Sequence, residues 1–298
     1  LFETVSFPFV DPAEEKPFRA WLDLCGTAAQ RLRLENPLDE GRRHLRSTLL
    51  PGILDALSVN ARHGQESAGL FEIGRAFGRQ GRPEAPESFE SRRLAFAISG
   101  QWRSHWSEPA FLRPADFFDA RGITERLLGT WIAPECLSWS PFAAEGFARG
   151  AAALARTESG EAVAVVGAAA PAEREKRRLP ESVFAGELVL GAAAARAAAV
   201  TYHPYSAFPA IEADLSFAQP RDLPWAELER FVRAQGLANL ESLALRDRYE
   251  GAGVGEGMVK TTLRLIFRSA ERTLERDEAN REVERLAAAL REKMEMVL

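Results

Sequence analysis

Apolar and polar residues follow two rhythms in the first two hundred residues. Stretches that alternate with a period of two predict strands with one buried face; they cover residues 2–10, 69–77, 94–99, 161–168 and 183–190. Stretches that repeat every three to four residues predict helices over 12–25, 50–61 and 116–128. Residues 78–91 are polar and rich in Gly and Pro, which predicts a loop. The pattern indicates an α+β module.

The pattern resets at Tyr202. Strand-like alternation returns over residues 210–217, 242–251 and 259–269, and helical periodicity covers 224–235 and a final segment that begins with Thr273 as its N-cap. The order β-α-β-β-α, with a fourth strand drawn from before Ile211 or after Met296, predicts a ferredoxin-like split βαβ sandwich. The alanine run 192–200 predicts a joint, and we therefore expect two domains, 1–200 and 201–298.

Composition narrows the class of protein. The 298 residues are 46% apolar and 27% charged, which is typical of a soluble globular protein. A net charge of −5 argues against bulk attraction to nucleic acid, so that any RNA contact has to be local. No apolar run is long enough to span a bilayer, so no membrane partner is expected. Cys25 and Cys136 lie far apart without a CxxC partner, which fits a reducing cytoplasm, and the start at Leu1 suggests a piece of a longer protein.

Motifs for catalysis and metal binding are missing from the sequence. Four scattered histidines (His44, His63, His105, His203) have no metal-ligand spacing, and no GxSxG occurs. The glycine-rich segment 251–261 fails the spacing of both phosphate-binding motifs and is read as a hairpin loop. Residues 147–171 carry alanine or glycine where a catalytic pocket needs polar groups. We expect no catalytic residue and no metal ligand in this chain.

One cationic cluster raises a question. Residues 36–57 read NPLDEGRRHLRSTLLPGILDAL, with Arg42, Arg43, His44 and Arg46 just before a helix that has Pro51 in its first turn. Such a cluster could clamp a phosphate or ATP, contact RNA, or join another protein.

Several longer segments resemble one family in order. LFETVSFPFV, NPLDEGRRHLRSTLLPGILDAL, LFEIGRAF, DFFDARGITERLL, FPAIEADLSF, DRYEG followed by VKTTLRLIF, and RTLERDEAN are similar to the C-terminal half of bacterial phenylalanyl-tRNA synthetase β subunits. The resemblance covers nearly the whole chain.

The resemblance implies two modules. Residues 1–200 would form an inactive module with the antiparallel sheet and flanking helices of class II synthetases, and residues 201–298 a ferredoxin-fold anticodon-binding domain. ATP and Mg²⁺ would belong to a catalytic α subunit, with no cofactor in this chain. The partners would be that α subunit, in an (αβ)₂ heterotetramer, and phenylalanine tRNA.

The resemblance also assigns the cationic cluster. Glu72 and Arg75 stand in the wrong order for the arginine–glutamate pair of an active class II site, and we interpret them as packing residues with a surface salt link. No glutamate partner or phosphate loop accompanies the arginines of the cluster, so we interpret Arg46 as a structural arginine that bonds backbone or a carboxylate such as Glu72. Arg42 and Arg43 become surface or partner-facing charges. The helix that follows would lie at the subunit interface, through Leu49, Leu50, Pro51, Leu54 and Leu57.

RNA contact is assigned to the second domain. Strand alternation puts Lys260, Thr262, Arg264, Ile266 and Arg268 on one face. The neighbouring strand adds Arg246 and Arg248, which predicts five cations on one open sheet face for tRNA binding: Arg246, Arg248, Lys260, Arg264 and Arg268. Glu212 and Asp214 would oppose them in part, and Glu212 and Ala213 stand where relatives usually carry arginines.

Three hypotheses remain open at this point. The chain is a non-catalytic scaffold and tRNA-binding part of a synthetase, a stand-alone RNA-binding module without a synthetase partner, or a self-sufficient ligase. The missing ATP-binding motifs count against the third.

Overall fold

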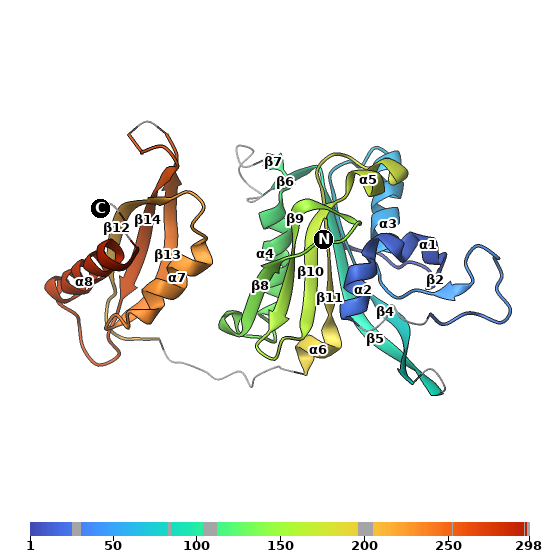
Figure 1. Cartoon of the computed structure of the whole chain (residues 1–298), viewed down its shortest axis with the longest axis horizontal. Coiled ribbons are helices and arrows are strands. Elements are labelled where there is room, and N and C mark those ends of the chain that lie inside the picture. Colours follow the sequence, from blue (N-terminus) through green and yellow to red (C-terminus); the bar gives the residue numbers. More distant parts are fainter. Residues whose placement is uncertain are drawn as a thin grey trace. The chain divides into compact units, whose positions relative to one another are not determined.

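The computed structural model describes residues 1–25, 31–82, 85–103, 112–195, 205–251, 253–294 and 296. The chain divides into two compact units, Leu1–Val200 (unit 1) and Thr201–Leu298 (unit 2). Figure 1 shows a mixed sheet with helices in unit 1 and a smaller sheet with helices in unit 2.

Unit 1 is built on a seven-stranded sheet in the order β1-β4-β5-β11-β10-β9-β8. Its strands are β1 (Phe2–Glu3), β4 (Ala68–Arg82), β5 (Ala85–Ser99), β8 (Leu137–Pro141), β9 (Phe147–Thr157), β10 (Ala162–Ala169) and β11 (Val183–Val189). All neighbours pair antiparallel except β1 and β4, which are parallel. Two small ribbons pair β2 (Phe9–Val10) with β3 (His44–Leu45) and β6 (Gln101–Arg103) with β7 (Leu112–Pro114).

Helices cover both faces of this sheet (Figure 1). On one face lie α1 (Pro12–Glu15), a 3₁₀ turn (Lys16–Phe18), α2 (Arg19–Leu24) and α3 (Leu50–Arg62), and α5 (Pro171–Arg177) packs beside α3. The opposite face carries α4 (Phe117–Leu128) and α6 (Leu190–Ala194), and a 3₁₀ turn (Pro134–Cys136) leads into β8.

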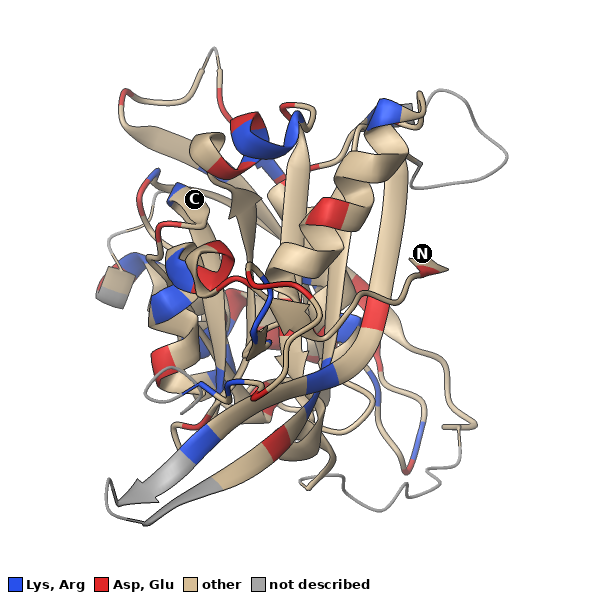
Figure 2. Cartoon of the chain, turned by 90° about the vertical axis from the view of Figure 1, so that its right-hand side faces the viewer, with Lys and Arg blue, Asp and Glu red and all other residues tan. Residues whose placement is uncertain are grey.

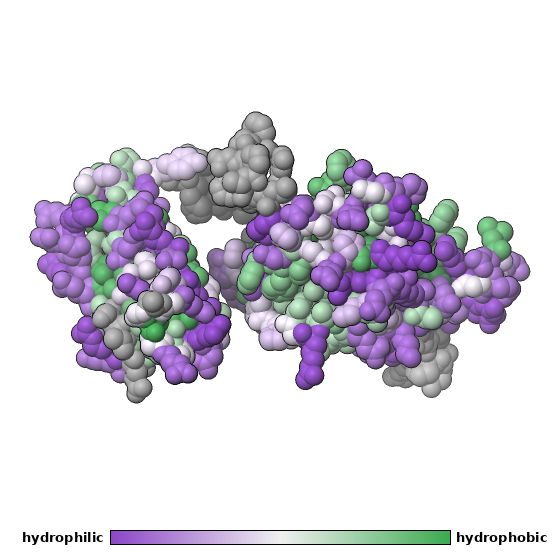
Figure 3. Space-filling view, turned by 90° about the horizontal axis from the view of Figure 1, so that it is seen from above, coloured by the Kyte–Doolittle hydropathy of each residue, from purple (hydrophilic) through white to green (hydrophobic). Residues whose placement is uncertain are grey.

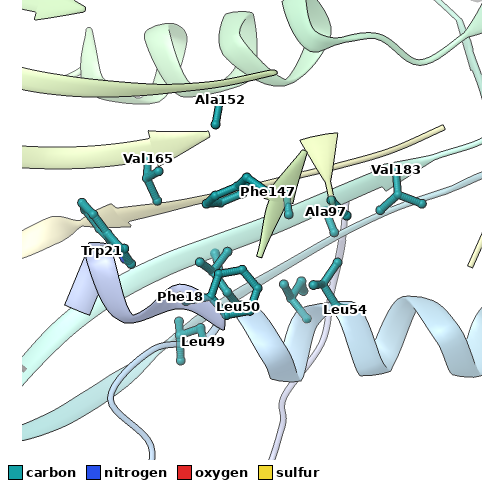
Figure 4. Packing of buried hydrophobic residues seen from close by; sticks show 14 of the residues in the cluster. Phe18, Trp21, Leu49, Leu50, Leu54, Ala97, Phe147, Ala152, Val165 and Val183 are labelled. Atoms are coloured by element: carbon teal, nitrogen blue, oxygen red, sulfur yellow. The ribbon is translucent and has the colours of Figure 1, made fainter. Parts of the chain in front are cut away.

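The alternation of β5 shows how the two cores are divided. Ala95 and Ala97 belong to the cluster under α2 and α3, whereas Leu94, Phe96 and Ile98 belong to the cluster under α4. Figure 4 shows the first cluster, in which Leu50 and Leu54 lie near Ala97 and Phe18 lies near Phe147. The rings of Phe18 and Phe147 meet edge to face, with centroids 5.7 Å apart.

The alanine-rich stretch is explained by this packing. Ala153 and Ala155 of β9 and Ala164 of β10 are buried in the cluster under α4, while Ala152 and Ala162 are buried on the other face. Small side chains let helices approach both faces closely, as interior packing at high density requires. Residues 147–171 are therefore mainly the helix-packing strands β9 and β10 rather than the lining of a cleft.

Several predicted boundaries in unit 1 were wrong. Residues 78–91 are mostly the distal part of the β4–β5 hairpin, since the strands continue to Arg82 and resume at Ala85. Polar residues hide this strand because it extends away from the core. The N-terminal strand predicted over 2–10 is two short strands, β1 and β2, separated by residues 4–8. The helix α5, which lies between the predicted strands 161–168 and 183–190, was not predicted.

Unit 2 has the β-α-β-β-α order expected of a ferredoxin-like sandwich, which confirms that prediction. Strands β12 (Ile211–Pro220), β14 (Met258–Phe267) and β13 (Leu240–Tyr249) form an antiparallel sheet with β14 in the centre. Helices α7 (Trp225–Ala234) and α8 (Arg276–Met294) bury one face. Within the described residues no fourth strand joins this sheet.

The start of α8 differs from the prediction. The helix begins at Arg276, so Thr273 is not its N-cap. Instead, the carboxylate of Glu278 accepts the backbone N–H of Glu275 at 2.9 Å. The alanine run beyond residue 195, predicted as the domain joint, lies outside the described residues.

Candidate nucleic-acid interface and subunit-contact surface

Arg46, from the cationic cluster, is a buried structural residue. Its Nη1 lies 2.7 Å from Oε1 of Glu72, and its Nε donates to the carbonyl of Arg75 at 3.0 Å. Ser6 from the N-terminal segment donates to the other Glu72 oxygen at 2.6 Å. The predicted bond between Arg46 and Glu72 is confirmed. Glu72 is 1% exposed, so this salt link lies inside the chain rather than at its surface.

Two more buried carboxylates hold the residues that follow. Glu15 accepts the backbone N–H groups of Ser47 and Thr48 at 2.5 and 3.2 Å. Burial raises the pKa of Glu15, although these N–H groups and Arg31 act against that rise. Glu187 accepts the Thr48 hydroxyl at 2.9 Å and the Leu49 N–H at 2.6 Å.

Glu187 also links the helix start to the sheet. Its second oxygen accepts from Nη1 of Arg93 at 2.8 Å and from Nε1 of Trp21. The N-terminus of a helix attracts anions through its free N–H groups. Just before α3 the chain's own carboxylates accept the N–H groups of Ser47, Thr48 and Leu49, and the Thr48 hydroxyl accepts that of Leu50 at 3.2 Å. The sequence signal was an acidic residue inside the apolar strand 183–189.

The five residues predicted at a subunit interface are buried in the chain's own core: Leu49, Leu50, Pro51, Leu54 and Leu57. Their exposed fractions are 0% or 1% for the four leucines. A partner cannot contact side chains that already face the sheet, so this assignment was wrong. The helical period was read correctly, but periodicity alone does not say which neighbour covers the apolar face.

A different apolar surface is exposed in unit 1. Phe2, Val5 and Phe7 are 78%, 85% and 75% exposed. Several large apolar side chains exposed on one segment are typical of a surface that binds a partner. The other large apolar side chains exposed on the N-terminal segment, the following loop and α3 are Leu1, Phe9, Leu38 and Val59. In Figure 3, hydrophobic residues are visible on the otherwise mainly hydrophilic surface of unit 1.

A groove of about 870 Å³ accompanies this surface. It runs between the N-terminal segment, the outer side of α3 and the end of α5, and its lining includes Val5, Phe7, Phe9, Val59 and Arg42. We call Val5, Phe7, Phe9 and Val59, which line the groove, together with Phe2 of the same N-terminal segment, the N-terminal apolar surface. Strand-like alternation over 2–10 hid it from the sequence analysis, because an alternating strand is expected to bury one side.

Charges elsewhere in unit 1 are mixed in sign. Arg43 pairs with Glu40, and Arg75 on β4 pairs with Glu90 on β5. Figure 2 shows blue and red segments interspersed along the β4–β5 hairpin. Arg42 is exposed, as predicted for a surface charge.

In unit 2 the second face of the sheet is open. Along β14 the residues Val259, Thr261, Leu263, Leu265 and Phe267 are buried under the helices, while the intervening side chains are exposed or half-buried. Register places Asp214 and Ala244 opposite Arg264, so all three share the open face. The prediction that Lys260, Arg264 and Arg268 share one face with Thr262 and Ile266 agrees with this pattern.

A β-bulge changes the prediction for β13. Leu245 pairs with Leu263 but Asp247 pairs with Thr262, so Arg246 is an extra residue. Arg248 therefore falls opposite buried Thr261, and its Nη2 donates to the carbonyl of Arg221 at 2.6 Å. Its predicted place on the open face was wrong, because a one-residue insertion exchanges the two faces of a strand.

Three of the remaining cations are paired with carboxylates. Arg264 binds Asp214 through two nitrogens at 3.0 and 3.2 Å, and Arg246 reaches the same carboxylate. Arg268 lies 2.9 Å from Glu241. Within the described residues Lys260 has no ion pair, and exposed Tyr249 lies opposite it in the register. Tyr249 was not predicted from the sequence, where its signal is an aromatic residue at the end of a polar strand.

Metal and thiol chemistry finds no support in the described part of the chain. No group of three His, Cys, Asp or Glu side chains is placed to hold a metal ion there. Of the four histidines, His105 and His203 lie outside the described residues. Burial raises the pKa of Cys25 to about 12, so its thiol stays protonated and is a poor nucleophile. The described helices include none that is long and apolar enough to cross a membrane.

Comparison with known proteins identifies relatives of this chain. Phenylalanine–tRNA ligase beta subunits of Moorella thermoacetica, Symbiobacterium thermophilum and a Synechococcus species are 30%, 32% and 29% identical. These alignments cover 99%, 87% and 82% of this chain, but 36%, 29% and 30% of the relatives. The chain thus spans about a third of the length of the curated relatives it matches.

Two family models match in sequence order. The model described as the ferredoxin-fold anticodon binding domain matches residues 206–298, and the model described as the phenylalanyl tRNA synthetase beta chain CLM domain matches residues 1–190. Since the second covers more than half of the chain, the chain belongs to the family of the phenylalanyl tRNA synthetase beta chain CLM domain, followed here by a ferredoxin-fold anticodon binding domain.

Proposed function

We propose that this chain is a non-catalytic part of the β subunit of phenylalanine–tRNA ligase. It supports ATP-dependent attachment of phenylalanine to its tRNA by scaffolding a catalytic α subunit and by binding the anticodon region of the tRNA. In this proposal the α subunit uses ATP and Mg²⁺, and the assembly is an (αβ)₂ heterotetramer in the cytoplasm. The observation that carries the proposal is the match of both family models in order over two separate units.

The structure supports a scaffolding role through the N-terminal apolar surface. Both sheet faces of unit 1 are closed by buried side chains, whereas Phe2, Val5 and Phe7 expose most of their apolar area. Apolar side chains gain free energy when a partner covers them, at roughly 25 cal/mol per Å² of area buried. We therefore assign the α-subunit contact to this surface, in place of the buried face of α3.

Co-expression with an α subunit from the same genome tests the scaffold. The wild-type chain should form a complex that performs phenylalanine-dependent ATP–pyrophosphate exchange, while the isolated chain should not. Replacing Val5 and Phe7 by Asp should weaken the complex at least tenfold, because two charges would enter an apolar contact. The matched control is Phe118→Asp, since Phe118 on α4 is 73% exposed on the other side of unit 1.

Three outcomes would contradict parts of this proposal. Exchange activity in the isolated chain would favour a self-sufficient ligase. Failure of the wild-type chain to associate at micromolar concentration would favour a stand-alone RNA-binding module. Normal association of the Val5 and Phe7 variant would place the contact elsewhere.

The RNA contact is assigned to the open sheet face of unit 2. Arg246, Lys260, Arg264 and Arg268 supply cations there, and Tyr249 supplies a ring on which a base can stack. Reversing Arg246, Arg264 and Arg268 to Glu should weaken binding of a phenylalanine tRNA transcript and lower the salt slope by about 0.7 for each lost phosphate contact. Arg248→Glu is the matched control, because it changes the same charge on the opposite side of β13. Equal affinities across a salt series would refute this assignment.

A further inference from the structure

We propose that Asp214 limits the RNA affinity of unit 2 by holding two arginines that an RNA phosphate would otherwise bind. The inference rests on the proposed tRNA-binding function of the open sheet face. In this inference Asp214 weakens RNA binding, instead of contributing a favourable contact.

Strand register brings the three residues together. Asp214 on β12 lies directly opposite Arg264 on the central strand β14. Arg264 engages both carboxylate oxygens, Nε to Oδ1 at 3.0 Å and Nη2 to Oδ2 at 3.2 Å. This two-bond geometry is the one a guanidinium also uses to bind phosphate. The carboxylate therefore occupies the donors that a phosphate needs.

The bulge in β13 delivers the second arginine. Arg246 is the unpaired residue between Leu245 and Asp247, and its Nη1 donates to Oδ2 of Asp214 from the far side of β14. A single carboxylate on the edge strand β12 thus pairs with arginines from the other two strands of the sheet. Glu212, two residues before Asp214 on β12, lies 3.3 Å from Nη1 of Arg264 and also pairs with this arginine.

Charge over the open face balances as a result. Four cations, Arg246, Lys260, Arg264 and Arg268, are matched by four carboxylates, Glu212, Asp214, Glu241 and Asp247. A polyanion gains little long-range attraction from a neutral face. It must also displace Asp214, which then recruits a cation from solution and reduces the net release of counterions.

Removing the negative charge of Asp214 should free Arg246 and Arg264 to bind RNA phosphates. For Asp214→Asn we expect about two- to thirtyfold tighter binding of a phenylalanine tRNA transcript, because each of the two exposed ion pairs that RNA has to break is worth about 1.4- to 5-fold. The salt slope should become steeper by about 0.7 for each arginine that gains a phosphate. Glu212→Gln should act in the same direction with a smaller effect, since its single contact is longer.

The experiment measures tRNA affinity of the full chain over a salt series. Glu284→Gln is the matched control, because Glu284 is an exposed carboxylate on α8, which packs on the other side of the sheet. Thermal melting of each variant checks that unit 2 is folded. Tighter binding and a steeper slope for Asp214→Asn, with no change for Glu284→Gln, support the proposal.

Other results overturn it, and they separate it from the proposed function. Weaker binding by Asp214→Asn would make Asp214 a positioning residue that orients Arg246 and Arg264 for RNA. Unchanged binding, together with a loss in the Arg246, Arg264 and Arg268 reversal, would leave the RNA face in place and remove only the limiting role. Unchanged binding in both sets would reject the RNA face itself.

Discussion

Unit 1 and unit 2 both use carboxylates to hold arginines, but at opposite places in a sheet. In unit 1 Glu187 and Arg93 are completely buried, and Glu187 also accepts from the start of α3. In unit 2 Asp214 and Arg264 lie about one third exposed on an open face. Carboxylate–arginine pairs therefore lie in the core of unit 1, whereas in unit 2 they neutralise charge on an exposed sheet face.

The difference follows from how many faces each sheet has covered. Helices close both faces of the unit 1 sheet, so charged side chains inside it, such as Arg93 and Glu187, have to be paired there. Only one face of the unit 2 sheet is closed. Its polar side chains stay within reach of a polar ligand.

The largest test of this comparison is Glu187→Gln. Arg93 would keep a buried charge without its carboxylate, and breaking such a pair costs about 3–5 kcal/mol in the free energy of unfolding. Calorimetry of the full chain should show one of two transitions shifted strongly downward. Glu90→Gln is the control, because its pair with Arg75 is exposed, and it should change stability by less than about 0.5 kcal/mol. A similar small change for Glu187→Gln would mean that the buried pair is dispensable.

A smaller effect is expected from filling the alanine layer under α4. Ala164 is fully buried among α4 and neighbouring strands, so Ala164→Leu should cost about 1–3 kcal/mol by overpacking. Urea unfolding of the full chain measures it. Ala172→Leu on the exposed side of α5 should be nearly neutral. A neutral Ala164→Leu would contradict close packing between α4 and β10.

Asp214→Asn should alter stability much less than Glu187→Gln. Its ion pairs are exposed to water, so the free energy of unfolding should fall by no more than about 1 kcal/mol. Chemical denaturation of the same variant used for RNA binding provides the measurement. A loss comparable with that of Glu187→Gln would erase the distinction between core and surface pairs.

The smallest expected effect is on the stability of the chain at low pH. A hydrogen bond from Arg272, with a second from the Glu275 N–H, lowers the pKa of Glu278 to about 2. Because the folded pKa lies below the ordinary value near 4.5, this stabilisation is complete above pH 4.5 and is lost as pH falls toward 2. Carboxyl NMR titration should show the low pKa, and Arg272→Gln should move it back toward its ordinary value. An ordinary pKa in the wild-type chain would contradict the contact.

The prediction from sequence succeeded where local pattern is enough. The 3.6-residue period of Leu50, Ile53, Leu54 and Leu57 identified α3, and strict alternation from Val259 to Phe267 identified β14 with its open and covered faces. Long matching segments identified the family. The bond between Arg46 and Glu72 followed from the absence of any phosphate-binding partner for that arginine.

Only the tertiary structure decided what each face meets. It covered the apolar face of α3 with the chain's own sheet, left Val5 and Phe7 exposed, and used the alanines of β9 and β10 to seat helices. It also inserted Arg246 as a bulge, which moved Arg248 away and brought Arg246 to Asp214. Periodicity fixes which side chains share a face, whereas register, bulges and the neighbour on that face depend on contacts between residues far apart in sequence.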